Sequence, residues 1–175
     1  YGSPLHLAAK QLYPTAGSMA TFPVTILPVK TGDNFIAAKG SLTLTGEAAS
    51  AASRITITVG GLDILVTVAK GEELSAINQE IVRVINAESD RCVTALLVPG
   101  SEDNPDVIEL TARWSGSLGN RIGLSVAGDI PGIAITVAAF ADGAGVPDVD
   151  EALAKIGGIW ETFILDTFTL FSGMV

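Results

Sequence analysis

The stretch "RITITVGGLDILVTV" (residues 54–68) decides the fold class of this sequence. On both sides of Gly60–Gly61, apolar residues occupy every second position: Ile55, Ile57 and Val59 before the glycines, and Leu62, Ile64, Val66 and Val68 after them. An alternation of this kind is typical of a strand with one buried face. A pair of glycines supplies the positive φ angles that a two-residue hairpin turn needs. The sequence therefore predicts an antiparallel β-hairpin.

The segments around this hairpin predict more strands and one helix. The run "ELSAINQEIVRVINAES" (73–89) predicts an amphipathic helix with polar residues outward and one apolar side, made of Leu74, Ile77, Ile81, Val84 and Ile85. Five other runs predict strands: "SLTLTG" (41–46), "CVTALLV" (92–98), "VIELTARW" (107–114), "RIGLSV" (121–126) and "GIAITVAAF" (132–140). Residues 31–145 are therefore expected to form a β-rich domain with one packed helix.

The two ends of the chain have a different pattern, in which a helix precedes a strand. In "GSPLHLAAKQLYP" (2–14), Ser3 is a good N-cap and Pro4 suits the first helical turn, and a strand is expected at 24–27. "VPDVDEALAKIGGIW" (146–160) predicts a second helix, and "ETFILDTF" (161–168) follows it as an apolar strand. We therefore expect an α+β fold, with the β-rich domain inserted into a partial α/β domain made of residues 1–30 and 146–175. Both ends look cut, which predicts a fragment of a longer protein.

The composition excludes several classes of partner. The net charge is -9, whereas nucleic-acid binding needs clustered Lys and Arg, and anionic membranes attract basic segments. No apolar run is long enough to span a bilayer. Cys92 is the single cysteine, so we expect no internal disulfide and a small, buried hydrophobic side chain. The lone His6 has no second histidine with which to hold a metal or complete a triad, and it is expected on a helix surface.

A glycine-rich segment, "WSGSLGNRIGL" (114–124), raises the question of a phosphate-binding loop. The P-loop motif needs a GK[ST] ending that is missing here, and the glycines do not follow the GxGxxG spacing of dinucleotide sites. The residues after it alternate like a strand, so the site would lack the helix N-terminus that binds anions. We therefore predict a bend, in which Gly116 and Gly119 adopt angles forbidden to other residues and Asn120 adopts the left-handed conformation.

Acidic residues gather at two places. The turn "SEDNPD" (101–106) carries Glu102, Asp103 and Asp106 but lacks the ladder of a calcium loop, so we expect a solvated turn. Asp148 and Asp150 are expected to complement a helix dipole, since no histidine or nucleophile motif accompanies them.

The two tryptophans, Trp114 and Trp160, are expected to be core anchors instead of a platform for sugars. No catalytic, cofactor-binding or metal-binding residue is predicted anywhere in the sequence, and the protein is not expected to be an enzyme.

Several of these segments, in this order, resemble the sheath protein of contractile bacteriophage tails, in its Mu-like branch. The most specific pieces are the helix ending in "INA" (85–87), "LTAR" (110–113) with Gly116, Gly119, Asn120 and Ile122, and the "GxGxPDV" turn of Gly143, Gly145, Pro147, Asp148 and Val149. The ordered series runs from about residue 2 to residue 166 and so covers most of the chain.

The resemblance implies a structural function in a virion tail. Sheath subunits stack as hexameric rings around a tail tube, and a signal from the baseplate makes the array contract and drive the tube through the host envelope. The implied partners are other sheath subunits, the tail tube protein and the baseplate, with assembly in the host cytoplasm and no cofactor. By comparison with the family, this sequence is expected to be a fragment without the N-terminal arm and the large C-terminal domain. The isolated chain is therefore expected to be a monomer.

Two other functions remain open at this point. The β-rich domain is also compatible with a surface binding or adhesion module of a phage tail, which would bind a protein or a glycan as a free unit. A small α/β enzyme with an acidic pair would instead need a pocket that combines carboxylates from the two helix–strand units, among them Asp148.

Overall fold

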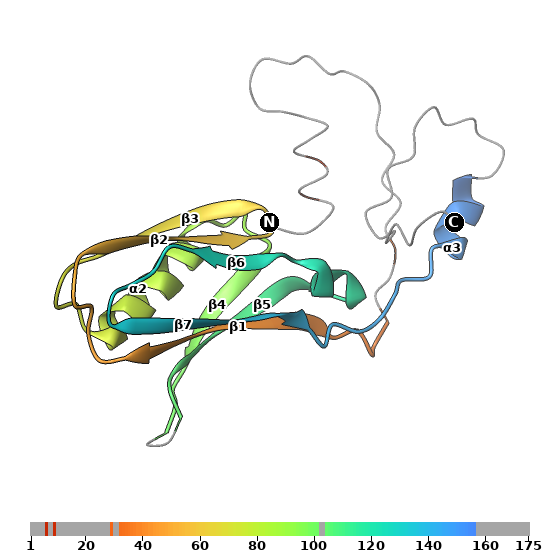
Figure 1. Ribbon diagram of the computed structural model, residues 1–175. Coiled ribbons are helices and arrows are strands. Elements are labelled where there is room, and N and C mark those ends of the chain that lie inside the picture. Colours follow the sequence, from red (N-terminus) through yellow and green to blue (C-terminus); the bar gives the residue numbers. More distant parts are fainter. Residues whose placement is uncertain (1–5, 7–8, 10–28, 30–31, 102–103, 157–175) are drawn as a thin grey trace, which may run out of the picture.

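The computed structural model describes residues 6, 9, 29, 32–101 and 104–156. In this part of the chain, seven strands form two antiparallel sheets, accompanied by two α-helices and one 3₁₀ turn (Figure 1). Their bounds are β1 Ala37–Gly46, β2 Ser53–Val59, β3 Leu62–Val68, α2 Leu74–Ala87, β4 Val93–Val98, β5 Val107–Ser115, η1 Ser117–Arg121, β6 Leu124–Ala127, β7 Ile133–Ala141 and α3 Asp150–Ile156.

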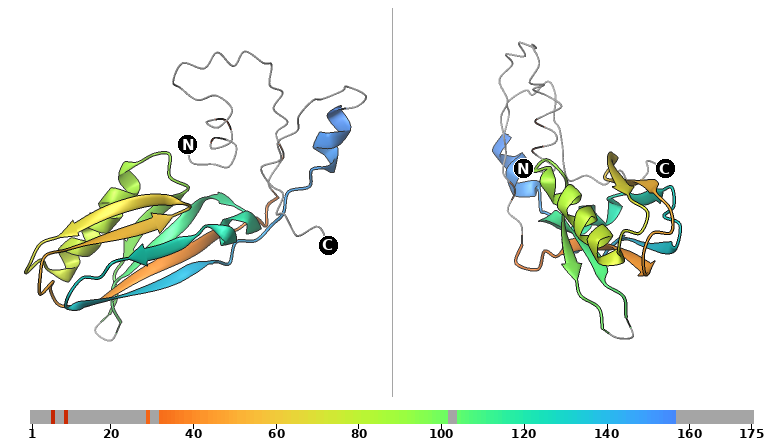
Figure 2. Two further views of the ribbon diagram at one scale, coloured as in Figure 1. Left: turned by 45° about the horizontal axis from the view of Figure 1, so that its top comes forward. Right: turned by 90° about the vertical axis from the view of Figure 1, so that its left-hand side faces the viewer.

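The two sheets face each other, and α2 fills the space along one side. One sheet has the strand order β4-β5-β1-β7 and the other has the order β3-β2-β6. Helix α2 contacts β4 and β3, the edge strands on one side, and also β1, while β6 and β7 lie next to each other on the opposite side (Figures 1 and 2). The fold class is therefore α+β, mostly β with one packed helix, as the sequence predicts for this region.

The predicted hairpin is confirmed as β2–β3, with a register that runs from Val59↔Leu62 to Ser53↔Val68. Gly60 and Gly61 have φ angles of 59° and 81°, the pair of positive values found in a type I′ turn. Its inward residues are buried, except that Leu62 beside the turn is 48% exposed. The alternation therefore identifies the buried face correctly but not the point at which the core ends.

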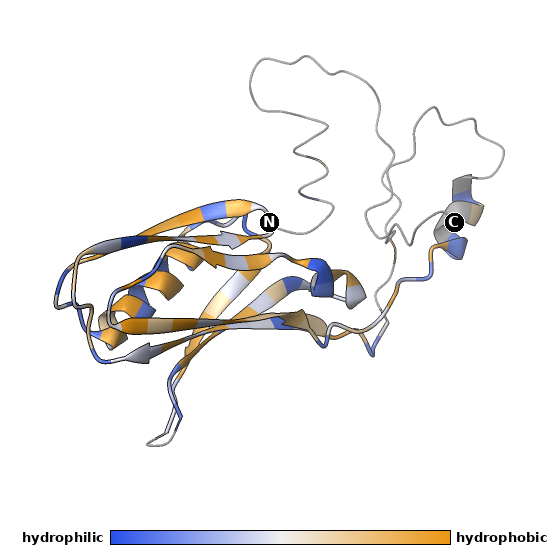
Figure 3. Ribbon diagram, in the orientation of Figure 1, coloured by the Kyte–Doolittle hydropathy of each residue, from blue (hydrophilic) through white to orange (hydrophobic). Residues whose placement is uncertain are grey.

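The core lies between the inner faces of the sheets and α2. Its largest buried side chains include Leu42, Leu44, Ile55, Ile57, Ile64, Ile77, Ile81, Ile85, Ile108 and Leu110. Polar and apolar residues alternate along the strands and around α2 (Figure 3). Each fully buried branched aliphatic side chain stabilises the fold by about 1.5–3 kcal/mol. The apolar side of α2 differs from the prediction in two respects: Asn78 is buried with it, and Leu74 and Val84 are only partly buried.

Two strand predictions differ from the structure. Residues 121–126 were expected to form one strand, but Arg121 closes the η1 turn and β6 begins only at Leu124. The reason is local, because the N–H of Ile122 bonds the carbonyl oxygen of Gly119 at 3.1 Å and so continues the turn. Strand β1 begins at Ala37, four residues before the predicted start, because β5 and β7 pair with it on both sides.

The predicted α/β domain falls mostly outside the described residues. His6 and Ala9 are helical, and α3 confirms a helix within 146–160, whereas the strands expected at 24–27 and 161–168 lie outside. The insertion of residues 31–145 into such a domain stays a prediction. Among the described residues, no helix is both long and apolar enough to cross a membrane.

Candidate functional site

The chain enters and leaves the β-rich domain at the same place. Just before β1, the N–H of Ile36 donates to the carbonyl oxygen of Ala144 at 2.9 Å, and the N–H of Ala144 donates back to Ile36 at 3.1 Å. The incoming and outgoing segments therefore form an antiparallel pair at one end of the domain (Figure 1). We call this pair and the turn that packs on it the neck, defined as residues 35–36, 116–120 and 143–145.

The η1 turn holds both segments of the neck. The N–H of Gly116 donates to the carbonyl oxygen of Ile36, and the N–H of Ser117 donates to that of Gly145, both at 2.9 Å. Asn120 adds a pair of bonds, since its Nδ2 donates to the carbonyl oxygen of Gly143 at 2.9 Å and its Oδ1 accepts the N–H of Gly143 at 2.7 Å. The carboxamide of Asn120 thus takes the place that a neighbouring strand would occupy.

Glycines let the segments of the neck approach this closely. A Cβ at Gly145, where φ is 100°, would lie 2.5 Å from the Phe35 ring. A Cβ at Gly143 would lie 2.7 Å from both the carbonyl oxygen of Gly116 and the Oδ1 of Asn120. Side chains at these positions would therefore separate the turn from the two segments that it holds.

The predicted role of the glycine-rich segment is partly wrong. Gly116 has a φ of 122° and confirms the prediction of a backbone angle that favours glycine. Gly119 and Asn120 are not in the left-handed region. Gly119 is needed for space instead, because a Cβ there would lie 2.8 Å from the Cβ of Ala38. Asn120 matters for its side chain and not for its backbone angle.

Three backbone N–H groups of this segment are already engaged inside the fold. Those of Gly116 and Ser117 bond the neck segments, and that of Gly119 bonds the carbonyl oxygen of Gly116 at 3.3 Å. The segment continues into strand β6. It is therefore a clamp on the backbone and not a cradle for a phosphate, which agrees with the predicted bend.

The acidic side chains of Asp148 and Asp106 bond the backbone and so have a structural role. Asp148 Oδ1 accepts the N–H of Asp150 at 3.0 Å, just ahead of α3, as a helix-capping carboxylate does. Asp106 Oδ1 accepts the N–H of Gly100 at 2.8 Å across the β4–β5 turn, and Glu102 and Asp103 lie outside the described residues. Among the residues described, no group of three or more His, Cys, Asp or Glu side chains is placed to hold a metal ion.

The structure also describes the surroundings of three other residues discussed in the sequence analysis. Cys92 is buried, as predicted, and desolvation by burial raises the pKa of its thiol. His6 is half-buried, with its Nε2 at 3.8 Å from Asp90 Oδ1. Trp114 packs against the core, although its buried indole N–H finds no acceptor among the described residues. Trp160 lies outside the described residues.

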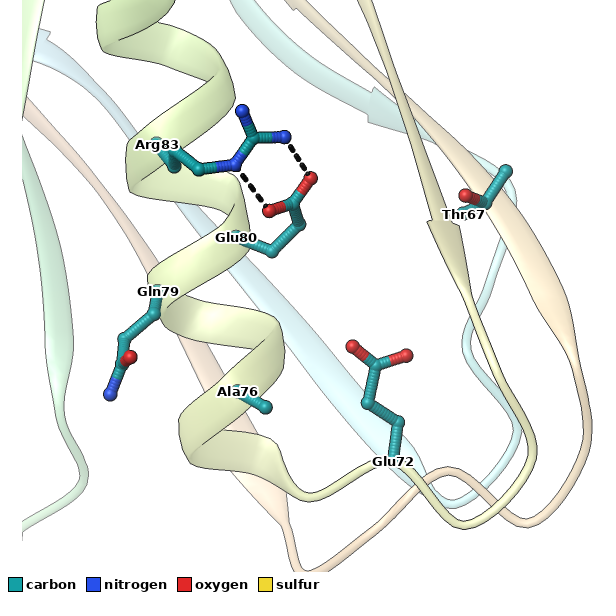
Figure 4. Close-up of a pocket in the computed structure, with 6 residues that line it drawn as sticks. All are labelled: Thr67, Glu72, Ala76, Gln79, Glu80 and Arg83. Atoms are coloured by element: carbon teal, nitrogen blue, oxygen red, sulfur yellow. Dashed lines mark hydrogen bonds and ion pairs between the residues drawn. The ribbon is translucent and has the colours of Figure 1, made fainter.

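Sequence reasoning missed a shallow groove between α2 and β3 (Figure 4). Its lining residues are Thr67, Glu72, Ala76, Gln79, Glu80 and Arg83. Arg83 forms two hydrogen bonds of 2.6 and 2.7 Å with Glu80, and these bonds lower the pKa of Glu80 and raise the pKa of Arg83. Glu72 Oε2 accepts the N–H of Ala69 at 2.7 Å. The charged groups of the groove thus bond one another or the backbone.

The chain is similar in sequence to a known tail protein. The chain is 26% identical over 155 residues to the Mu-like prophage FluMu tail sheath protein of Haemophilus influenzae, and the match covers 86% of this chain and 30% of that protein. The chain is thus a distant relative of a Mu-like tail sheath protein, and it spans about 30% of the length of that relative. No protein-family model matches the chain.

The similar solved structures are flagellar cap domains. The FliD D2–D3 domains from Escherichia coli give a TM-score of 0.32 at 23% identity, over 64% of this chain and 72% of that chain. The FliD D2–D3 domains from Serratia marcescens give 0.28 at 14% identity, over 70% and 86% of the two chains. TM-scores of this size do not establish a shared fold.

The structure brings together the two sequence motifs that resemble the sheath family most closely. The first motif supplies Gly116, Gly119 and Asn120, and the second supplies Gly143 and Gly145. They are separated by more than twenty residues in the chain and are joined in the neck by the bonds of Asn120 and Ser117. The neck is therefore the candidate functional site.

Proposed function

We propose that this chain is part of a tail sheath subunit and has a structural role in a contractile tail. The observation that carries the proposal is the meeting of the two motifs in the neck, in a chain 26% identical to a Mu-like tail sheath protein over 155 residues. The two motifs are distant in the sequence, yet the first bonds the backbone of the second, so both contribute to the same structural element.

The neck suits a domain that must keep its direction on a larger assembly. Two paired segments and a clamping turn fix the direction of the β domain relative to its point of attachment, whereas a single flexible linker would let it rotate. In the proposed sheath, subunits form hexameric rings around a tail tube, and the β domain is carried outward on the neck. Contraction on a signal from the baseplate would then move each β domain as a unit with its neck.

The residues of the neck have no chemical role in this proposal. Gly116, Ser117 and Asn120 use their polar groups to bond the backbone of the neck. Work in such an assembly comes from rearranged contacts between subunits, which requires no cofactor. We therefore propose a structural protein, located in the virion tail, and not an enzyme.

A second candidate is a binding or adhesion module of the tail. The β4–β5 hairpin projects beyond the rest of the domain (Figures 1 and 2), and two of its apolar side chains, Leu96 and Val98, are 63% and 40% exposed. A projecting hairpin with exposed apolar residues suits contact with another molecule. This function would need the domain at the host-facing end of the tail, whereas the sheath function needs it along the whole length.

Electron microscopy with a labelled antibody separates the two candidates. Gold-labelled Fab fragments raised against this chain would be applied to tail particles of the phage or prophage that encodes it. The sheath proposal expects label at regular intervals along the tail, in both extended and contracted particles. Label confined to the baseplate or fibres would replace it with the adhesion function, and unlabelled tails would refute both.

A further inference from the structure

The edge strands of the two sheets differ in how well they are protected. An exposed edge presents unpaired N–H and C=O groups, and proteins usually block it with bulges, charges or covering side chains. On β4, Asn86 bonds both backbone groups of Ala95, at 2.8 and 2.9 Å. Strand β7 carries an irregularity opposite Lys39 and Ser41, and the four-residue β6 lies next to it. Within the described residues, the edge of β4 is thus bonded by a side chain, the pairing of β7 is irregular at one end, and β6 is short.

Strand β3 is the remaining edge; α2 lies beside it, and the strand itself is long and regular. It pairs with β2 over seven residues without a register shift. Since Val59 and Leu62 flank a two-residue turn, they form a hydrogen-bonded pair, and the bonding then alternates along the strand. The backbone groups of Asp63, Leu65 and Thr67 therefore point away from β2. No described residue bonds them.

The same three residues have side chains on the outer surface of the sheet. Leu65 is 52% exposed at the middle of the strand, and Asp63 is held by Thr58, whose Oγ1 donates to Asp63 Oδ1 at 2.7 Å. Thr67 borders the open groove beside α2 (Figure 4). The edge thus combines backbone groups that have no partner among the described residues, one exposed apolar side chain and a single charge near its end.

We propose that β3 pairs antiparallel with β3 of a second copy of this chain, about a two-fold axis that passes beside Leu65. In that register Leu65 faces its own mate, and Asp63 of each copy faces Thr67 of the other. Backbone groups that lack partners in one copy meet complementary groups in the second. The two three-stranded sheets become one continuous sheet with the order β6-β2-β3-β3-β2-β6.

Charge favours a second copy as the occupant of this edge. The pairing brings two apolar side chains together at the axis and places each Asp63 opposite an uncharged threonine, so like charges do not face each other. Glu80 and Arg83 already neutralise each other beside the groove. The chain as a whole carries a charge of -9, so a contact between two copies is favoured only where like charges do not face each other.

A contact of this kind closes on itself. A two-fold interface uses the same patch on both copies and stops at two, whereas rings and tubes grow through head-to-tail contacts. The proposed pair is therefore a contact of the unassembled chain, and it replaces the monomer expected from the sequence. It does not rest on the proposed sheath function, because it concerns only the isolated protein in solution.

Cysteine cross-linking of the full chain tests the register. In a hydrogen-bonded antiparallel pair the Cα atoms lie about 5.5 Å apart, which suits a disulfide, so Leu65→Cys is expected to form a disulfide-linked dimer under mild oxidation. Thr67→Cys is the matched control on the same edge, because its mate would be about 14 Å away. Leu96→Cys controls for exposure alone. Cys92 stays in place in all variants, since it is buried.

Sedimentation equilibrium tests the contact without cross-linking. The wild-type chain is expected to show a reversible monomer–dimer equilibrium that Leu65→Lys shifts to monomer and Leu96→Lys leaves unchanged. Thr67→Pro is expected to act like Leu65→Lys, because it removes only an outward N–H. Thermal unfolding followed by circular dichroism identifies variants that fail to fold.

Three results would overturn the proposal. The first is a wild-type chain that sediments as a monomer at every concentration reached. The second is equal cross-linking of the Leu65→Cys and Thr67→Cys variants, which would mean random collision. The third is a dimer that Leu96→Lys dissociates as well as Leu65→Lys, which would place the contact on the face of the other sheet.

Discussion

The carboxamide of Asn86 bonds both backbone groups of Ala95, donating from Nδ2 to the carbonyl oxygen at 2.8 Å and accepting the N–H at Oδ1 at 2.9 Å. The carboxamide of Asn120 does the same to Gly143, at 2.9 and 2.7 Å. In both places one asparagine side chain replaces a paired strand. The fold thus completes its backbone hydrogen bonding with side chains at the edge of β4 and in the neck.

Asn86 and Asn78 lie on the same helix, and replacing each with leucine is expected to change the free energy of unfolding in opposite directions. Asn78 is 1% exposed, and neither atom of its carboxamide has a partner among the described residues. Asn78→Leu is therefore expected to raise the free energy of unfolding by about 1–3 kcal/mol, because a desolvated polar group is removed. Urea denaturation measures the change, and a destabilised Asn78→Leu variant would mean that its carboxamide is bonded in solution.

Asn86→Leu is expected to lower the free energy of unfolding by about 1–2 kcal/mol, because both of its bonds to Ala95 are lost. Faster hydrogen exchange at the amide of Ala95 would accompany the loss. An unchanged exchange rate at Ala95 would show that the amide is protected by other means.

Gly119→Ala is expected to destabilise the domain by about 1–3 kcal/mol through overpacking. The added Cβ would lie 2.8 Å from the Cβ of Ala38 and 3.3 Å from that of Ala112. Gly123→Ala is the matched control, because a Cβ at Gly123 meets nothing within 4 Å. Thermal unfolding of both variants provides the comparison.

A double substitution separates crowding from backbone strain at Gly119. If crowding against Ala38 is the cause, Ala38→Gly combined with Gly119→Ala will be more stable than the sum of the two single effects predicts. Strictly additive effects would contradict the steric explanation.

Asn120→Ala is expected to loosen the neck and to lower the free energy of unfolding by about 1–2 kcal/mol. Hydrogen exchange at the amide of Gly143 should increase more than exchange in β2–β3, because the lost bonds are local. Asn104→Ala removes a bond from Asn104 Nδ2 to Ser101 Oγ in an exposed turn and is the control. If the two variants had equal effects on stability and hydrogen exchange, the bonds of Asn120 would not stabilise the neck.

Cys92 makes stability depend on pH in the alkaline range. Burial raises the pKa of its thiol, so above about pH 9 the unfolded chain loses this proton while the folded chain keeps it. The contribution is fully present at neutral pH and decreases as the pH rises through the pKa of the unfolded thiol. The free energy of unfolding of the wild type should fall more steeply above this pH than that of Cys92→Ala. Parallel pH curves would contradict the prediction.

Sequence patterns correctly predicted those helices and strands that are determined by residues close together in the sequence. The β2–β3 hairpin follows from alternating apolar residues around Gly60 and Gly61, and α2 follows from its amphipathic spacing. Asn78 breaks the rule that polar residues face outward, so the spacing could not show that it is buried. The end of the core at Leu62 likewise depends on how far the opposite sheet extends.

The bend at residues 114–124 could be predicted from the sequence, but its place in the neck could not. The glycines at 116 and 119 indicated a bend, but the crowding of Gly119 comes from Ala38, about eighty residues away in the chain. The same is true of Asn120, whose partner Gly143 follows 23 residues later. Contacts of this kind depend on the order of strands in the sheet, β4-β5-β1-β7, which no local pattern contains.

The pairing of Ile36 with Ala144 also affects how this protein can change over evolutionary time. Because these two residues lie opposite each other, with an N···O distance of 2.9 Å, we expect loops between them, such as the β4–β5 turn, to tolerate changes in length without moving the points where the flanking chain continues. We therefore expect related genes to carry different versions of this region as long as residues 116–120 of the neck are kept, because the two borders then leave the flanking chain in register.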